Sequence, residues 1–140
     1  MKFNEFALGQ VFRTKSAAVT LESITEFASV YDPQYMHLDA EKAAAGRFGG
    51  IIASGIQTMA LSFKLWVETG VYGEEVVAGT AMNDIRFIKP VYPNDELRVE
   101  AEVVGLDERK RSGIVTVLLN TFNHKGQKVF SGELSALVGK

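Results

Sequence analysis

Residues 53–69, with the sequence ASGIQTMALSFKLWVET, are the segment that most limits how this 140-residue chain can fold. Apolar side chains occupy more than one narrow stripe of a helix drawn through this segment, and a helix that is apolar on nearly all sides is usually buried. Gly70 follows at a position where helices commonly end. We therefore expect a long central helix that the rest of the chain has to cover.

The segments after this helix have the composition of β-strands. β-branched residues alternate with turn signals, so strands are expected near residues 76–89, 96–106, 113–122 and 128–138. The connections between them are short, and short connections join antiparallel neighbours. The chain is therefore predicted to be a single α+β domain over residues 1–140, with a long central helix wrapped by an antiparallel β-sheet.

The segment before the central helix is expected to contain one strand and two helices. Residues 10–19 fit a first strand, and Thr20 is a good N-cap for a helix over LESITEFASVY. Pro33 should end this helix at Asp32, because proline disfavours the α conformation in the residue before it. Asp39 is a second good N-cap, for a short helix through the sequence EKAAA.

The composition excludes several classes of function. The net charge is −2, so no basic excess favours nucleic-acid binding, and the absence of Cys excludes thiolate nucleophiles and Cys-based metal centres. Neither a signal peptide nor a membrane-spanning segment is recognisable, which predicts a cytoplasmic protein. Hydrophobic residues make up 46% of this small chain, and burying that surplus favours a homodimer or a dimer-based oligomer.

The chain has two histidines in different contexts. His124 precedes Lys-Gly in an expected hairpin turn, where a solvent-facing side chain is predicted. His37 follows Asp32 by five residues, a spacing that separates two side chains by about 140° on a helix and places them on opposite faces of a strand. The two can meet only if the backbone between them is irregular. Pro33 forces such a break.

A paired Asp32 and His37 could act as general base and acid. Asp32 is expected at the C-terminal end of the first helix, where the helix dipole makes a carboxylate more basic, and a wall formed by Tyr35 and Met36 would add desolvation. Taken alone, the spacing favours purely structural roles for both residues. A metal site with Asp39 as a third ligand is poorly supported, because zinc sites rarely combine two carboxylates with one histidine.

The sequence FGGIIASG leads into the central helix. Backbone N–H groups in the first turn of a helix, here around residues 54–56, are free to stabilise a developing oxyanion. Gly55 would let a substrate carbonyl approach the backbone closely. Taken alone, the pattern favours a simpler interpretation, a capped helix with glycines that serve packing. The Gly-Lys-Ser/Thr ending of a phosphate-binding loop is missing.

Together, and in this order, these segments resemble the MaoC-like dehydratases, which include the (R)-specific enoyl-CoA hydratases. The similarity spans nearly the whole chain. It implies a hot-dog fold, in which an antiparallel sheet wraps a long helix and two such domains usually pair. The matching motifs are Asp32…His37-Leu38-Asp39, then Phe48-Gly49…Ile52-Ala53-Ser54-Gly55, and then Arg86-Phe87-Ile88-Lys89-Pro90-Val91 followed by Asn94-Asp95.

The resemblance implies a hydro-lyase that adds water reversibly to a trans-2-enoyl-CoA thioester and gives a 3-hydroxyacyl-CoA, without metal or other cofactor. Asp32 would act as general base, and His37 would orient the water and handle the proton at the α-carbon. The N–H group of Gly55 would stabilise the enolate oxygen. The implied substrate contact at the helix head is Ser54. The phosphates of coenzyme A would need basic contacts, for which Arg47, Arg86 and Lys89 are candidates near the matched segments, although each residue taken alone favours an ordinary surface charge.

The chain departs from the family pattern in two places. The pattern commonly reads Asp-x-Asn-Pro-x-His, whereas here Pro33 directly follows Asp32 and Gln34 takes the Asn position. Ser54 stands where many members have His before the helix-head glycine.

Two other functions remain open. A hot-dog thioesterase would share the architecture, but such enzymes generally have an acidic residue on the central helix, and here that helix has only Glu68, near its end. The chain could also be a non-catalytic subunit of a heteromeric dehydratase. The bulky residues Tyr35, Met59, Phe63 and Trp66 could line an acyl tunnel or belong to the core.

Overall fold

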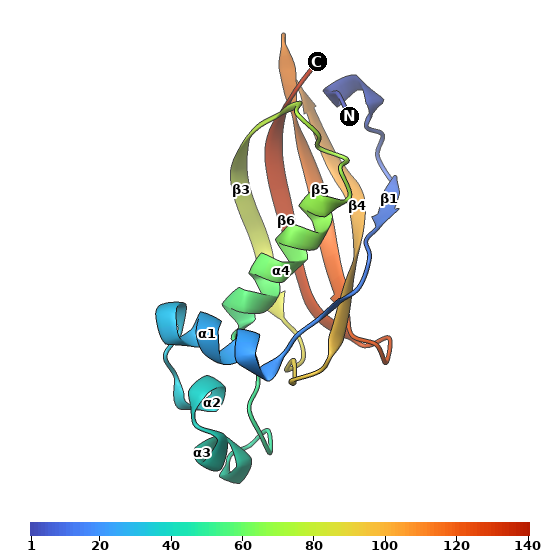
Figure 1. The fold of residues 1–140 in the computed structure, drawn as a ribbon. Helices are drawn as coiled ribbons and strands as arrows, with labels where there is room; N and C mark the ends of the chain where they lie inside the picture. Colours follow the sequence, from blue (N-terminus) through green and yellow to red (C-terminus); the bar gives the residue numbers. More distant parts are fainter.

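A computed structural model describes residues 1–140 and shows a curved antiparallel sheet lying against one long helix (Figure 1). The strands are β1 (Val11–Arg13), β2 (Ala17–Ala18), β3 (Val76–Phe87), β4 (Glu96–Glu108), β5 (Ser112–Phe122) and β6 (Lys128–Gly139). The helices are the short 3₁₀-helix η1 (Phe3–Glu5) and the α-helices α1 (Leu21–Tyr31), α2 (Tyr35–Leu38), α3 (Ala40–Ala45) and α4 (Gly55–Glu68). This architecture confirms the predicted α+β hot-dog fold.

The sheet has the strand order β1-β4-β5-β6-β3, with β2 also paired to β4, and every pair is antiparallel. The four predicted C-terminal strands are present, each with both ends within two residues of the expected position. The single strand predicted over residues 10–19 is wrong, because two short strands occupy it. Between them the Oγ1 atom of Thr14 accepts a hydrogen bond from the N–H of Val99, so a side chain interrupts the regular ladder there.

The helices α1 and α3 begin at the predicted caps. Thr20 accepts from the N–H of Ser23 and forms a capping box with it, and Asp39 accepts from the N–H of Lys42. Helix α1 ends at Asp32, as the following proline predicts. A helical turn that the sequence analysis did not predict, α2, lies between α1 and α3 and contains His37.

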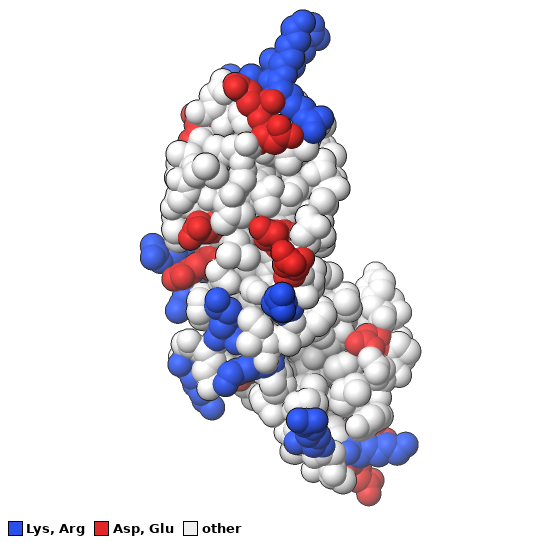
Figure 2. All heavy atoms as spheres, turned by 180° about the vertical axis from the view of Figure 1, so that it is seen from behind, with Lys and Arg blue, Asp and Glu red and all other residues white.

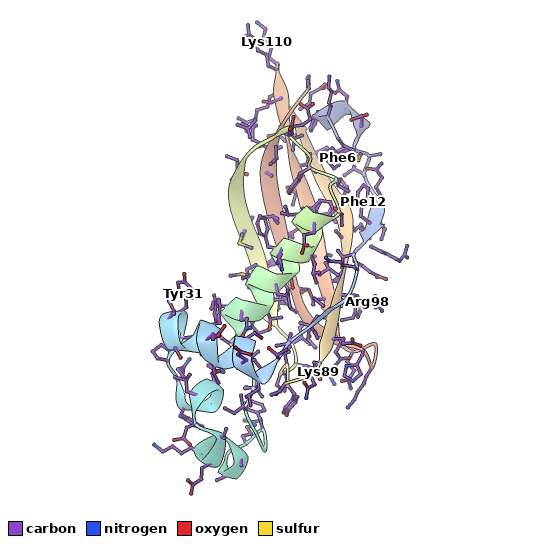
Figure 3. All side chains as sticks on the ribbon, viewed as in Figure 1. Phe6, Phe12, Tyr31, Lys89, Arg98 and Lys110 are labelled. Carbon is purple, nitrogen blue, oxygen red and sulfur yellow. The ribbon has the colours of Figure 1, made fainter.

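Helix α4 has Ser54 as its N-cap, and Gly70 just beyond its end adopts the left-handed conformation at φ +78°. Its buried face includes Leu65 and Trp66, and the Trp66 ring packs against Phe12 with 5.6 Å between ring centroids. Figure 3 shows Phe12 among the side chains between β1 and the helix.

The opposite face of α4 remains open, so the prediction of a helix buried on all sides is wrong. Ile56, Phe63 and Val67 are each more than 40% exposed. The sheet reaches around only one side of the helix, and β3 lies at its edge with nearly every residue exposed. An apolar hollow of about 420 Å³ lies between α4 and β3, lined by residues that include Met59, Phe63 and Met82.

A second apolar cluster joins the helical segment to the sheet. Ile24 of α1 and Ala43 of α3 are buried against Val129 and Phe130 of β6 and other core residues. This packing fixes α1 and α3 near the N-terminal end of α4, and α2 lies between them along the chain (Figure 1).

The charged side chains are distributed without a single dominant sign. On the face seen from behind, Lys and Arg alternate with Asp and Glu around broad uncharged areas (Figure 2). None of the helices has the length and apolar character that crossing a membrane requires.

Candidate active site

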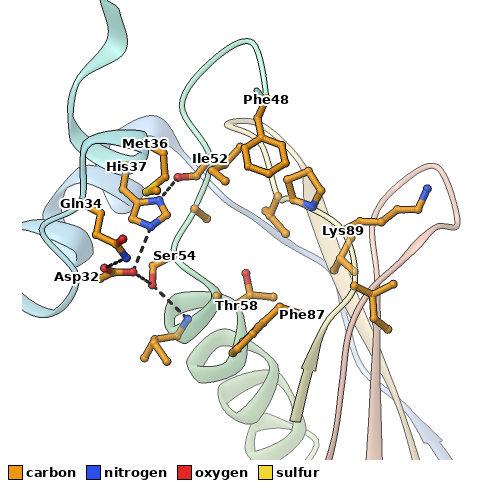
Figure 4. A pocket seen from close by; sticks show the side chains of 17 residues that line it. Asp32, Gln34, Met36, His37, Phe48, Ile52, Ser54, Thr58, Phe87 and Lys89 are labelled. Atoms are coloured by element: carbon orange, nitrogen blue, oxygen red, sulfur yellow. Dashed lines mark hydrogen bonds and ion pairs between the residues drawn. The ribbon is translucent and has the colours of Figure 1, made fainter. Parts of the chain in front are cut away.

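A cavity of about 440 Å³ opens between the helical segment and the end of the sheet (Figure 4). One wall is polar and contains Asp32, His37 and Ser54. The opposite wall is apolar and comes from residues 87–91 and Val129, and the first turn of α4 lies between the two walls. The cavity therefore combines titratable groups on one side with an apolar surface on the other.

Asp32 and His37 meet in the polar wall. The Nε2 atom of His37 lies 3.1 Å from Oδ2 of Asp32, and the side chains are 6% and 18% exposed, respectively. Asp32 occupies the C-cap of α1 with a non-helical backbone, and His37 lies on the separate turn α2. The break at Pro33 thus brings the two side chains together as the spacing predicts, although through a helical turn that was not expected.

The segment that leads into α4 holds the His37 ring in place. Nδ1 of His37 lies 2.6 Å from the carbonyl oxygen of Ile52, whose own N–H donates to the carbonyl of Met36. Because a carbonyl can only accept, Nδ1 must carry a proton. With Nδ1 bound to this carbonyl, Nε2 is the ring nitrogen that faces Oδ2 of Asp32.

Asp32 accepts two further hydrogen bonds from side chains. The Ser54 hydroxyl donates to Oδ2 at 2.7 Å, and Nε2 of Gln34 donates to Oδ1 at 2.6 Å. These bonds, with Ser54 as the largest cause, lower the pKa of Asp32 below its ordinary value, because they stabilise the ionised form. The expectation of a more basic carboxylate is therefore wrong. Desolvation does raise the pKa of Asp32, but the donors outweigh it.

Gln34 and Ser54 are also the residues at which the chain departs from the family pattern. Both departures thus converge on the same carboxylate. Ser54, expected to contact the substrate, is completely buried, and its hydroxyl oxygen also accepts from the N–H of Ile56 as the cap of α4.

Gly55, the first residue of α4, lines the cavity. Its N–H points out of the first turn of α4 and has no acceptor within the protein. The Phe87 ring lies directly against this glycine, so that a Cβ atom at position 55 would come within 2.7 Å of Cδ1 of Phe87. Glycine is therefore required here by the close contact as well as by access to the amide.

The other predicted site residues lie farther from the polar wall. Lys89 lines the cavity, but its amino group points away from it (Figure 4). Arg47 and Arg86 are exposed, do not line the cavity and form no ion pair. Tyr35 is 51% exposed and does not line the cavity, so the expected wall consists of Met36 alone.

The residues considered for other roles are also placed. Asp39 caps α3 and does not join Asp32 and His37. His124 is exposed in the turn between β5 and β6, as predicted. Trp66 belongs to the core, and Met59 and Phe63 line the hollow between α4 and β3.

Phe48, Phe87 and Thr58 are among the cavity residues for which no role was predicted. Phe48 covers the top of the cavity, held by a hydrogen bond from the Tyr92 hydroxyl to its carbonyl, and Phe87 forms part of the apolar wall. Thr58, one turn into α4, directs its hydroxyl into the cavity (Figure 4). Thr58 follows Gly55 by three residues, and this helical spacing was the available signal.

The chain is similar to several known proteins in sequence and structure. The uncharacterised protein YdeM of Bacillus subtilis is 59% identical over 99% of both chains. The 3-hydroxyacyl-thioester dehydratase Z of Mycobacterium tuberculosis is 31% identical over 77% of this chain and 73% of its own length. The structure of a MaoC-like dehydratase from Rhodospirillum rubrum superposes with a TM-score of 0.92 at 30% identity, covering 100% of this chain and 97% of that one. Residues 3–123 match the model of the MaoC-like domain, and the chain therefore belongs to the MaoC-like dehydratase family.

Proposed function

We propose that this protein is a hydro-lyase that adds water reversibly to a trans-2-enoyl-CoA thioester and gives a 3-hydroxyacyl-CoA. The observation that carries the proposal is the Asp32–His37 pair at 3.1 Å, facing the unpaired N–H of Gly55 across one cavity. Such chemistry needs a base, a proton donor and an oxyanion site, and the cavity offers one of each. The family relative that acts on 3-hydroxyacyl thioesters supports the same reaction class.

In the hydration direction, Asp32 acts as the base and His37 as the acid. Asp32 removes a proton from water while the water oxygen forms a bond to the β-carbon, and the electron pair of the double bond moves to the thioester oxygen. The lowered pKa of Asp32 keeps its carboxylate ionised before the water is deprotonated. Nε2–H of His37 then protonates the α-carbon, which restores the thioester carbonyl.

The pair resets itself without an outside proton. After one turnover Asp32 holds the proton from water and His37 has lost the Nε2 proton. Because Oδ2 and Nε2 are in contact, the proton moves from Asp32 to His37 and the starting state returns. The bond between Nδ1 and the Ile52 carbonyl keeps the ring in one orientation throughout.

The first turn of α4 stabilises the enolate. Its positive dipole end and the Gly55 N–H are fixed before the substrate binds, so charge that develops on the thioester oxygen meets a donor already in place. The apolar wall formed by Phe87, Pro90 and Val91 suits the acyl group. Outside the cavity, Arg47, Arg86 and Lys89 are exposed and free of acidic partners, and they are the candidate contacts for the phosphates of coenzyme A.

One assay tests the reaction. Purified protein is mixed with trans-2-enoyl-CoA substrates of short, medium and branched acyl chains, and the absorbance of the conjugated thioester is followed together with free thiol. We expect the absorbance to fall without thiol release. Thiol release would instead establish a thioesterase, and no reaction with any substrate would favour a non-catalytic subunit.

The position of Glu68 argues against a thioesterase. It is the only acidic residue on α4, it lies at the C-terminal end of the helix, and it pairs with Lys15 at 3.1 Å and Lys64 at 3.9 Å. It does not line the cavity. The helix thus has no carboxylate at the head, where the thioester would bind.

We further propose that the protein is a homodimer, formed by a second copy that covers β3 and the open face of α4. Val77 and Met82 on β3 are 66% and 43% exposed, and an unpaired edge strand with apolar side chains favours pairing. Light scattering after gel filtration should give about twice 15.3 kDa. Val77→Lys should shift the protein to the monomer, and a monomeric wild type would refute the proposal.

A further inference from the structure

The Asp32 carboxylate is held from two sides by residues that do not themselves react. Ser54, at the head of α4, donates to Oδ2, and Gln34, between α1 and α2, donates to Oδ1. We propose that Ser54 and Gln34 form a positioning pair that fixes both the orientation and the ionised state of the catalytic carboxylate. This inference rests on the proposed hydratase function and deepens it.

Ser54 donates its only hydroxyl proton to Asp32. A hydroxyl has one hydrogen to donate, and here the oxygen also accepts from the N–H of Ile56 at 3.2 Å. Ser54 therefore has no hydrogen left for the substrate and is completely buried. Its role is to join the head of α4 to the C-terminal end of α1, where Asp32 is located.

Gln34 completes the arrangement from the solvent side. Its amide reaches the second carboxylate oxygen at 2.6 Å, so neither oxygen of Asp32 can rotate without breaking a hydrogen bond. With His37 on Oδ2 as well, the carboxylate accepts three donors in total. Fixed donors of this kind orient a catalytic group before the substrate arrives.

Few other charges act on this carboxylate. The titratable residues that line the cavity besides Asp32 are His37 on α2 and Lys89 after β3, and the amino group of Lys89 points away. Neither the first turn of α4 nor the last turn of α1 has a charged side chain that faces the Asp32 carboxylate. The pKa of Asp32 is lowered by the hydrogen bond from Ser54, then by the hydrogen bond from Gln34, and then by the charge and hydrogen bond of His37. The two neutral donors therefore act on the carboxylate alongside the histidine.

The test removes each donor separately. Ser54→Gly deletes the hydroxyl and keeps a residue that caps helices nearly as well as serine, and Gln34→Met keeps the length of the side chain without its amide. The titration of the Asp32 carboxyl is followed by carbon-13 NMR, and kcat and KM are measured with a trans-2-enoyl-CoA. In both variants we expect the pKa of Asp32 to rise and kcat to fall about 10- to 100-fold, with KM changed less than about threefold, because one hydrogen bond to a charged group is lost.

Two controls separate positioning from stability. Ser54→Thr keeps a hydroxyl and should restore most of kcat and the low pKa of Asp32. Thr20→Ala removes the cap of α1. Because Thr20 contacts Ser23 and not Asp32, this variant should lower the melting temperature without changing kcat or the titration of Asp32.

The outcomes distinguish this inference from the proposed function. If Asp32 titrates in Ser54→Gly and Gln34→Met as in the wild type, or if kcat does not fall in them, the positioning pair is refuted. If the wild type does not hydrate any enoyl thioester, the proposed function fails, and the carboxyl titration still decides whether Ser54 and Gln34 control Asp32.

Discussion

The two halves of α4 have different surroundings. The N-terminal half borders the cavity and offers the unpaired N–H of Gly55 and the hydroxyl of Thr58. The C-terminal half places Leu65 and Trp66 in the core, both almost completely buried. One helix therefore borders the proposed reaction site at its head and contributes to the core at its tail. Substitutions in the two halves should separate activity from stability.

The largest effect is expected at the polar wall next to the helix head. Asp32→Asn removes the proposed base and His37→Ala removes the proposed acid, and each should lower kcat by about 10²- to 10⁴-fold. Turnover is measured by the loss of enoyl-thioester absorbance, and the fold is checked by circular dichroism. If either variant keeps wild-type turnover, that residue has no part in the mechanism.

At the other end of the helix, Trp66→Ala should destabilise the fold by about 3–5 kcal/mol, because it leaves a cavity where the indole packs against Phe12 and Tyr72. The free energy of unfolding is measured in urea. Lys64→Ala, whose side chain is 69% exposed, is the control and should change stability by less than about 0.5 kcal/mol. If kcat of folded Trp66→Ala falls as far as kcat of Asp32→Asn, the two halves of α4 do not separate activity from stability.

Gly55→Ala should lower both the activity and the stability. Its Cβ would overlap the Phe87 ring, so the ring or the helix head must move, at a cost of about 1–3 kcal/mol and a loss in kcat of about tenfold or more. Thermal unfolding and turnover are measured in the same samples. In a Phe87→Ala background the stability cost of Gly55→Ala should become smaller, and an unchanged cost would show that the contact with Phe87 is not its cause.

The smallest effect concerns acid stability. The pKa of Asp32 is lower in the folded chain than its ordinary value of 3.8, so the unfolded chain binds this proton first as the pH falls. The stabilisation is fully present above pH 3.8 and is lost as the pH falls from there through the lower pKa of the folded state. Urea unfolding at pH 7 and pH 3 should show a smaller loss of stability for Asp32→Asn than for the wild type. Equal losses of stability in Asp32→Asn and the wild type would contradict this prediction.

Local signals in the sequence predicted much of the fold. The caps Thr20, Asp39 and Gly70 act on residues within a few positions, so their role is visible without a structure. The meeting of Asp32 with His37 also followed from a local cause, the break at Pro33. The turn α2 was missed because four residues are too few to show a helical period.

Long-range contacts explain what the sequence did not predict. Ser54 lies 22 residues after Asp32, so its hydrogen bond and the resulting fall in the pKa of Asp32 depend on how α4 meets α1. The apolar character of α4 correctly predicted a helix but wrongly predicted burial within one chain. Ile56 and Phe63 are exposed because the sheet ends at β3.

Phe87 lies both at the edge strand of the sheet and in the wall of the cavity. This residue ends β3, is 55% exposed, and lies directly on Gly55. A neighbouring molecule that binds along β3 therefore also presses on the ring that bounds the reaction space. For the proposed homodimer, specific activity per chain should consequently fall on dilution below the concentration at which the two copies separate.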